Sequence, residues 1–123
     1  MTIPKDETSL LTAEEMLRRA SALIPVLKER AAKTEEMRRI PAETVQDILA
    51  SGLHLIAVPK RFGGIDVGYD VMHEVAAELG RGCGPTAWCY CLWSAHAWLV
   101  GHWSLAAQEE VFSDGPDTLI SSS

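Results

Sequence analysis

The chain has 123 residues, of which 47% are apolar and 23% charged, and its formal net charge is −6 at pH 7. This length and composition are typical of one globular domain with a modest core. The negative charge argues against a nucleic-acid partner, because phosphate binding favours a basic face.

The N-terminal part of the chain predicts a helix from Ala13 to about Lys33, where apolar residues recur at helical spacing. Thr12 and Glu15 have the spacing of a capping box at its start. Pro25 lies inside the pattern and is expected to bend or split the helix. Residues 1–12 are expected to form a flexible N-terminus.

A second helix is predicted to start at Pro41 and to end at Gly52, because proline is favoured in the first turn and glycine after the last. The apolar run His54–Val58 is expected to be extended, and Pro59–Gly64 is typical of a turn. A third helix is predicted from about Tyr69 to Leu79.

The next predicted helix, Pro85–Trp103, contains all four tryptophans and no charged residue. A helix that is apolar on all sides must be covered on all sides, either by the rest of the fold or by a ligand. We expect it to be the most buried element.

The same helix falls slightly short of the roughly 20 apolar residues that a bilayer requires, and it contains polar residues, so no membrane span is expected. Ser104 is predicted to cap a last helix that ends near Phe112.

The sequence therefore predicts an all-α fold, a bundle of about five or six helices over residues 13–117. Residues 118–123 have the pattern of the beginning of a strand. A lone strand has no partner for its backbone groups. We therefore expect the sequence to be the front of a longer protein, with 118–123 as the first strand of a β-domain that is missing here.

Three cysteines, Cys83, Cys89 and Cys91, lie close together in the sequence. The last two would point about 200° apart on a helix and so cannot chelate one metal ion. No zinc spacing is present, and no metal site is expected. Together with the absence of a secretion signal, buried free thiols indicate a reducing, cytoplasmic compartment.

His96 is the main candidate for chemistry, because an apolar and aromatic setting disfavours its charged form and suits acid, base or hydrogen-bonding roles near neutral pH. The alternative is a core histidine satisfied by a backbone carbonyl, and the same alternative applies to His102. Trp88 could stack on a planar cofactor or belong to the core. Residues 121–123 could donate hydrogen bonds to an electron-rich ring or be a polar strand end.

Six segments occur in a recognisable order: I-P-A-E-T-V-Q-D-I-L-A-S-G-L, V-P-K-R-F-G-G, V-A-A-E-L-G-R-G-C-G-P-T-A-W, H-A-W, A-A-Q-E-E-V-F and I-S-S-S. This order resembles the N-terminal helical domain of the acyl-CoA dehydrogenase superfamily over residues 13–123. The combination of G-P-T-A-W, H-A-W and I-S-S-S is similar to two-component flavin-dependent aromatic monooxygenases of the p-hydroxyphenylacetate hydroxylase type.

The resemblance implies an oxygenase that uses reduced FMN or FAD, forms a C4a-hydroperoxyflavin and hydroxylates an aromatic, phenolic substrate. It implies a separate flavin reductase and a homo-oligomer. It also implies that His96 is catalytic and that the cofactor-binding residues are Trp88, Ser121, Ser122 and Ser123. The family's β-domain and C-terminal helical bundle supply most flavin contacts, so this chain alone is expected to be inactive and to bind flavin weakly or not at all. Two alternatives stay open: a fragment of an acyl-CoA dehydrogenase-type FAD oxidoreductase, and a non-enzymatic helical interaction module.

Overall fold

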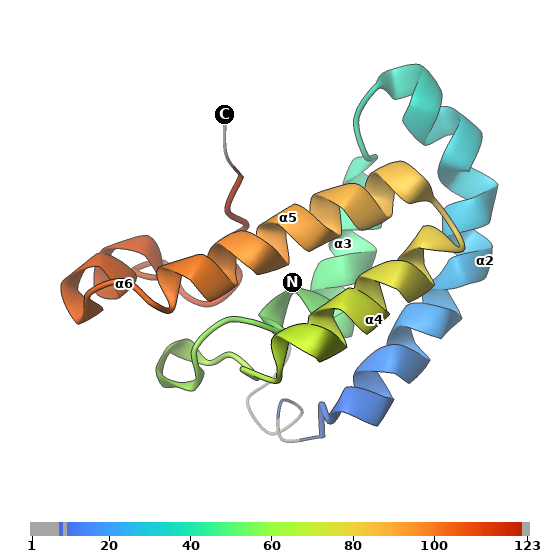
Figure 1. Ribbon diagram of the computed structural model, residues 1–123. Coiled ribbons are helices and arrows are strands. Elements are labelled where there is room, and N and C mark those ends of the chain that lie inside the picture. The colour runs from blue at the N-terminus through green and yellow to red at the C-terminus, as the bar shows by residue number, and fades with distance from the viewer. Residues whose placement is uncertain (1–7, 9, 122–123) are drawn as a thin grey trace.

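The structure is a computed structural model that describes Thr8 and residues 10–121 (Figure 1). Within these residues the fold is all-helical, as predicted, with five α-helices, two 3₁₀ turns and no strand. The elements are α2 (Ala13–Met37), α3 (Ala42–Ser51), η1 (Leu53–Leu55), η2 (Lys60–Phe62), α4 (Tyr69–Gly80), α5 (Gly84–Val100) and α6 (Leu105–Val111).

The C-terminal segment is irregular over residues 118–121, and residues 122–123 lie outside the described part of the chain. The strand expected at 118–123 therefore stays a prediction. The segment passes beside α5, and this places it against the helix that carries the tryptophans (Figure 1).

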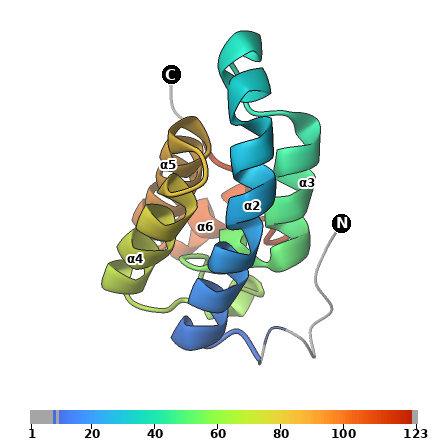
Figure 2. The ribbon, with the colours of Figure 1, turned by 90° about the vertical axis from the view of Figure 1, so that its right-hand side faces the viewer.

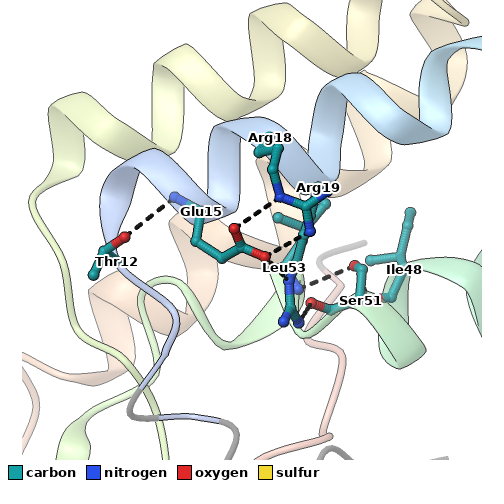
Figure 3. Close-up of polar contacts among 7 residues, drawn as sticks. All are labelled: Thr12, Glu15, Arg18, Arg19, Ile48, Ser51 and Leu53. Carbon is teal, nitrogen blue, oxygen red and sulfur yellow. Dashed lines mark hydrogen bonds and ion pairs between the residues drawn. The ribbon is translucent and has the colours of Figure 1, made fainter.

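The start of α2 is fixed by Thr12, whose hydroxyl oxygen accepts a hydrogen bond from the Glu15 N–H at 3.2 Å. The Glu15 carboxylate does not complete a capping box. It accepts hydrogen bonds from Arg18 at 2.7 Å and from Arg19 at 2.9 Å (Figure 3). Arg19 also donates to the Ser51 carbonyl at 2.9 Å, so this cluster joins the start of α2 to the end of α3.

Pro25 does not split α2, which runs without interruption for 25 residues and ends at Met37, later than predicted. A proline removes one backbone hydrogen bond and crowds the preceding turn. Here the flanking turns remain hydrogen-bonded, and Ala20 and Leu27 are buried on either side of Pro25. Most helical stability in proteins comes from such packing, so the helix continues through the proline.

The prediction of an extended piece at His54–Val58 is wrong. The chain turns at Gly52, where φ is 77°, and then forms η1 and further turns, all of them buried. The carbonyls of Leu55 and Ile56 accept hydrogen bonds at 3.0 and 3.1 Å from the loop that follows η2. In a run of only five residues, the spacing of apolar side chains does not distinguish a buried strand from a buried turn. This explains the wrong prediction.

Helix α4 packs against both α2 and α5, while α3 lies beside α2 and η1 (Figure 2). The core lies between these elements and includes Met16, Leu27, Ile48, Leu53, Ile56, Met72, Val75, Leu79 and Tyr90. No helix in the described residues combines the length and the apolarity that crossing a bilayer requires. None of the described helices covers the side of α5 on which Trp88 and Leu99 are exposed.

Candidate functional site

Helix α5 has two different faces. The face toward the core is buried and carries Thr86, Tyr90, Ser94, Ala97 and Val100. On the opposite side, Trp88 is 68% exposed and Leu99 is 46% exposed, while Leu92 and His96 are half-buried. We call these last four residues the outer face. Of the five described α-helices, α5 has the largest share of buried residues, five of 17, in line with the expectation that it is the most buried. It is not covered on all sides by the described residues, because Trp88 and Leu99 are exposed.

His96 lies at the edge of the outer face, next to the C-terminal segment. Its Nδ1 atom is 2.8 Å from the carbonyl oxygen of Ile120. A carbonyl only accepts, so Nδ1 carries the hydrogen, and in the neutral ring Nε2 then holds a free lone pair. No described residue hydrogen-bonds to Nε2. One nitrogen thus behaves as in a core histidine, and the other is left for acid–base chemistry.

Trp88 lies on the same side of α5 as His96, two turns earlier. The two positions are about 12 Å apart along the helix axis and about 80° apart around it. With its side chain 68% exposed, Trp88 is not a core residue. Ser121 is exposed and directly follows Ile120, so its backbone lies next to the His96 contact. Ser122 and Ser123 lie outside the described residues, and the roles predicted for all these residues stay predictions.

A contact between the buried His54 and the half-buried Asp117 holds the C-terminal segment to the core. His54 Nε2 is 2.6 Å from Asp117 Oδ1, and the His54 side chain is only 1% exposed. Burial lowers the pKa of His54 by more than the Asp117 carboxylate raises it, so the neutral ring donates its Nε2–H to the carboxylate. Sequence reasoning missed this pair because its members are 63 residues apart.

A separate cleft of about 590 Å³ lies at the C-terminal end of α5. Its lining includes Lys60 and Arg61 of η2 and a row of rings formed by Tyr69, Trp98 and His102. The ring centroids are 4.9 Å apart for the first pair and 4.4 Å for the second. Neither His96 nor Trp88 lines this cleft, so it is distinct from the predicted site.

The three cysteines are free thiols, but only Cys83 is buried, whereas Cys89 and Cys91 are half-buried. Burial raises the pKa of the Cys89 thiol, which disfavours its reactive thiolate form. Within the described part of the chain, no three His, Cys, Asp or Glu side chains gather as a metal site would require.

Residues 10–112 match the family described as acyl-CoA dehydrogenase, N-terminal domain. The chain belongs to this family. This acyl-CoA dehydrogenase N-terminal domain is 38% identical over 109 residues to a pigment production hydroxylase from Rhodococcus sp.. The match covers 89% of this chain and 28% of that protein. It is also 32% identical over 102 residues to the oxygenase component of an FADH2-dependent resorcinol hydroxylase from Rhizobium sp., covering 83% of the chain and 25% of that protein.

The crystal structure of the HsaA monooxygenase from Mycobacterium tuberculosis has the same fold, with a TM-score of 0.83 and 30% identity. The match covers 87% of this chain and 29% of that one. The resemblance to two-component flavin-dependent aromatic monooxygenases is confirmed by these relatives, several of which are named as oxygenase subunits or components. The domain spans about 28% of the length of the curated relatives it matches.

Proposed function

We propose that this domain is the helical part of a reduced-flavin-dependent oxygenase that hydroxylates an aromatic, phenolic substrate. The observation that carries the proposal is His96, whose Nδ1 is held by the Ile120 carbonyl at 2.8 Å while Nε2 stays free on an uncharged helix face. A neutral Nε2 accepts the hydrogen of a phenol, and the resulting electron-rich ring is the better nucleophile toward an activated oxygen atom. The names of the relatives support the same reaction class.

The outer face suits a reduced flavin, because residues 86–103 contain no Lys, Arg, Asp or Glu and Trp88 presents an exposed ring. When bound, reduced flavin activates molecular oxygen for transfer to the substrate. In this proposal Trp88 borders the flavin ring, and Ser121, Ser122 and Ser123 offer hydroxyl and amide hydrogen bonds to it. The apolar side chains exclude water from the reacting groups. The cofactor is reduced FMN or FAD; one relative is FADH2-dependent.

The proposal includes partners. A separate flavin reductase supplies the reduced cofactor, as the names "oxygenase subunit" and "oxygenase component" of the relatives suggest. We also propose that the oxygenase is a homo-oligomer and that it is cytoplasmic. The exposed apolar residues of α5 support association with further protein surface.

Two other functions are distinguishable from this one. An acyl-CoA dehydrogenase-type oxidoreductase shares the family, but the relatives described above are hydroxylases and monooxygenases. A non-enzymatic interaction module is favoured by one observation, the exposed Trp88 and Leu99 on α5. Such a module would use these side chains to bind a partner protein and would have no use for a free His96 Nε2.

A chimaera tests the proposal, with residues 13–121 replacing the homologous segment of the Rhizobium resorcinol hydroxylase oxygenase component. Supplied with FADH2 and oxygen, it is expected to hydroxylate resorcinol. Trp88→Ala is expected to weaken flavin affinity about 3- to 10-fold through lost ring contact. Trp103→Ala is the matched control, since Trp103 is also exposed but follows the end of α5. A folded chimaera that binds flavin but forms no product, or equal effects of the two substitutions, would contradict the proposal.

A further inference from the structure

We propose that His54 is a positioning residue for His96, acting through Asp117 and the backbone of residues 117–120. The importance of the His96 tautomer rests on the proposed function; the structural link itself does not. A closed ring of contacts carries this inference. It passes from α5 to η1, from η1 to the C-terminal segment, and back to α5.

The first contact fixes η1 relative to α5. The Tyr90 hydroxyl donates to the Leu53 carbonyl at 2.9 Å, and both residues are fully buried. His54 is the next residue in η1, with Leu55 buried after it. The backbone that carries His54 is therefore held against the same helix that carries His96.

The second contact fixes Asp117. Its Oδ1 atom is 2.6 Å from His54 Nε2, and the imidazole is buried. Loss of the carboxylate would leave a buried N–H donor without this acceptor, which is costly inside a protein. The Thr118 hydroxyl donates to the Gly115 carbonyl at 3.0 Å, so the turn around Asp117 is closed by a local hydrogen bond as well.

The third contact returns to α5. Ile120 packs partly buried against the core, and its carbonyl is 2.8 Å from His96 Nδ1. Residues 118–121 are irregular, so no helix or strand hydrogen bonds hold this carbonyl in place. Its position is set by the packing of the Ile120 side chain and by Asp117, three residues earlier, which is in turn held by His54. Without the carbonyl, the His96 ring is free to exchange between its two neutral tautomers.

NMR of the 123-residue chain labelled with ¹⁵N-histidine tests the inference at about pH 8, where an ordinary imidazole is neutral. Two-bond correlations separate protonated from unprotonated ring nitrogens, and the His96 signals are assigned with His96→Gln. The wild type is expected to show His96 with hydrogen on Nδ1. Asp117→Ala and His54→Leu are each expected to give a mixture of tautomers. Asp114→Ala, which removes an exposed carboxylate from the same loop, is expected to change nothing.

Rescue by Asp117→Asn, whose amide oxygen still accepts from His54, is expected to restore the wild-type tautomer. A folded Asp117→Ala or His54→Leu variant with an unchanged His96 tautomer would overturn the inference. Unfolding of both variants would also overturn it, because the pair is assigned a local role on residues 117–120. The readout needs neither flavin nor substrate. Its failure is therefore separable from a failure of the chimaera to hydroxylate resorcinol.

Discussion

Tyr90 joins two elements of this domain, α5 and η1, through its hydrogen bond to Leu53. It is also the largest fully buried side chain among the described residues. Burial raises the pKa of its phenol, so it remains a hydrogen-bond donor to Leu53 at any ordinary pH. The sequence places Tyr90 in a helix but cannot name its acceptor, which lies 37 residues earlier. The same limit applies to His54 and Asp117. Side-chain contacts between distant segments depend on how helices pack, which no local pattern contains.

Tyr90→Phe is expected to lower the free energy of unfolding by about 1–3 kcal/mol, because it removes a buried donor and leaves the Leu53 carbonyl without that partner. Urea denaturation followed by circular dichroism measures the loss. Tyr69→Phe is the matched control, since Tyr69 is 43% exposed. Equal losses in the two variants would show that the Tyr90 hydrogen bond does not stabilise the fold.

The pKa of Glu15 is lowered to about 2, first by its hydrogen bond from Arg18 and then by that from Arg19. A carboxylate with a lowered pKa stabilises the folded state above its unfolded pKa of 4.5 and loses that effect as the pH falls toward 2. Glu15→Gln is therefore expected to be less stable than the wild type at pH 7. Because the half-buried carboxylate is still reached by solvent, which screens its charge, the difference is small.

Thermal unfolding of Glu15→Gln and wild type across this pH range measures the effect. The gap in midpoint temperature is expected to close between pH 4.5 and about 2. Glu14→Gln serves as a control in the same helical turn, since Glu14 makes none of the hydrogen bonds to Arg18 and Arg19. A gap that stays constant with pH would contradict the assignment.

At the scale of elements, helix ends were predictable where a local device sets them. Thr12 caps α2, Gly52 ends α3 in the left-handed region, and Ser104 caps α6 by accepting from the Ala107 N–H at 3.2 Å. Each device acts within three residues of the backbone it fixes. The buried turns at 53–58 were not predictable, because they are held by hydrogen bonds from the loop after η2.

The two glycines of the F-G-G segment, Gly63 and Gly64, are needed for different reasons, one in the local backbone conformation and the other in packing against Val58. Gly63 has a φ of 95°, which favours glycine locally. A Cβ at Gly64 would instead overlap the backbone carbonyl of Val58. Gly64→Ala is therefore expected to cost about 3 kcal/mol or more, since backbone cannot move aside as a flexible side chain can.

Gly84→Ala is the matched control, because a Cβ at Gly84 meets nothing within 4 Å. It is expected to leave the stability unchanged or to raise it by about 0.5–1 kcal/mol at a helical position. Thermal melts of both variants make the comparison. A mild effect of Gly64→Ala would show that the 58–64 turn is loosely packed.

At the scale of the whole molecule, the family and helical fold were predictable from the order of segments along the chain. The site was predictable only in part. The sequence placed His96 and Trp88 on one helix, but the covering of that helix depends on all its neighbours, and its outer face proved open. The Ile120 carbonyl that orients His96 comes from an irregular segment with no sequence signal for the contact.

The open face predicts association of the isolated chain at high concentration, as well as binding of a hydrophobic dye. The double variant Trp88→Ser, Leu99→Ser is expected to weaken association at least about tenfold, because buried tryptophans contribute strongly to interfaces. Leu105→Ser is the control, since Leu105 is similarly exposed, at 47%, but lies on α6. Sedimentation that shows a strict monomer, with no dye binding, would contradict this prediction.

The most direct measurement of the central claim is product formed per flavin oxidised in the resorcinol hydroxylase chimaera, compared between His96→Ala and His102→Ala. His102 stacks on Trp98 with centroids 4.4 Å apart and donates from Nδ1 to the Trp98 carbonyl, away from the outer face. His96→Ala is expected to slow hydroxylation about 10²–10⁴-fold while flavin oxidation continues, with hydrogen peroxide in place of product. His102→Ala is predicted to retain the yield of the unsubstituted chimaera. Equal yields from His96→Ala and the unsubstituted chimaera would contradict the account.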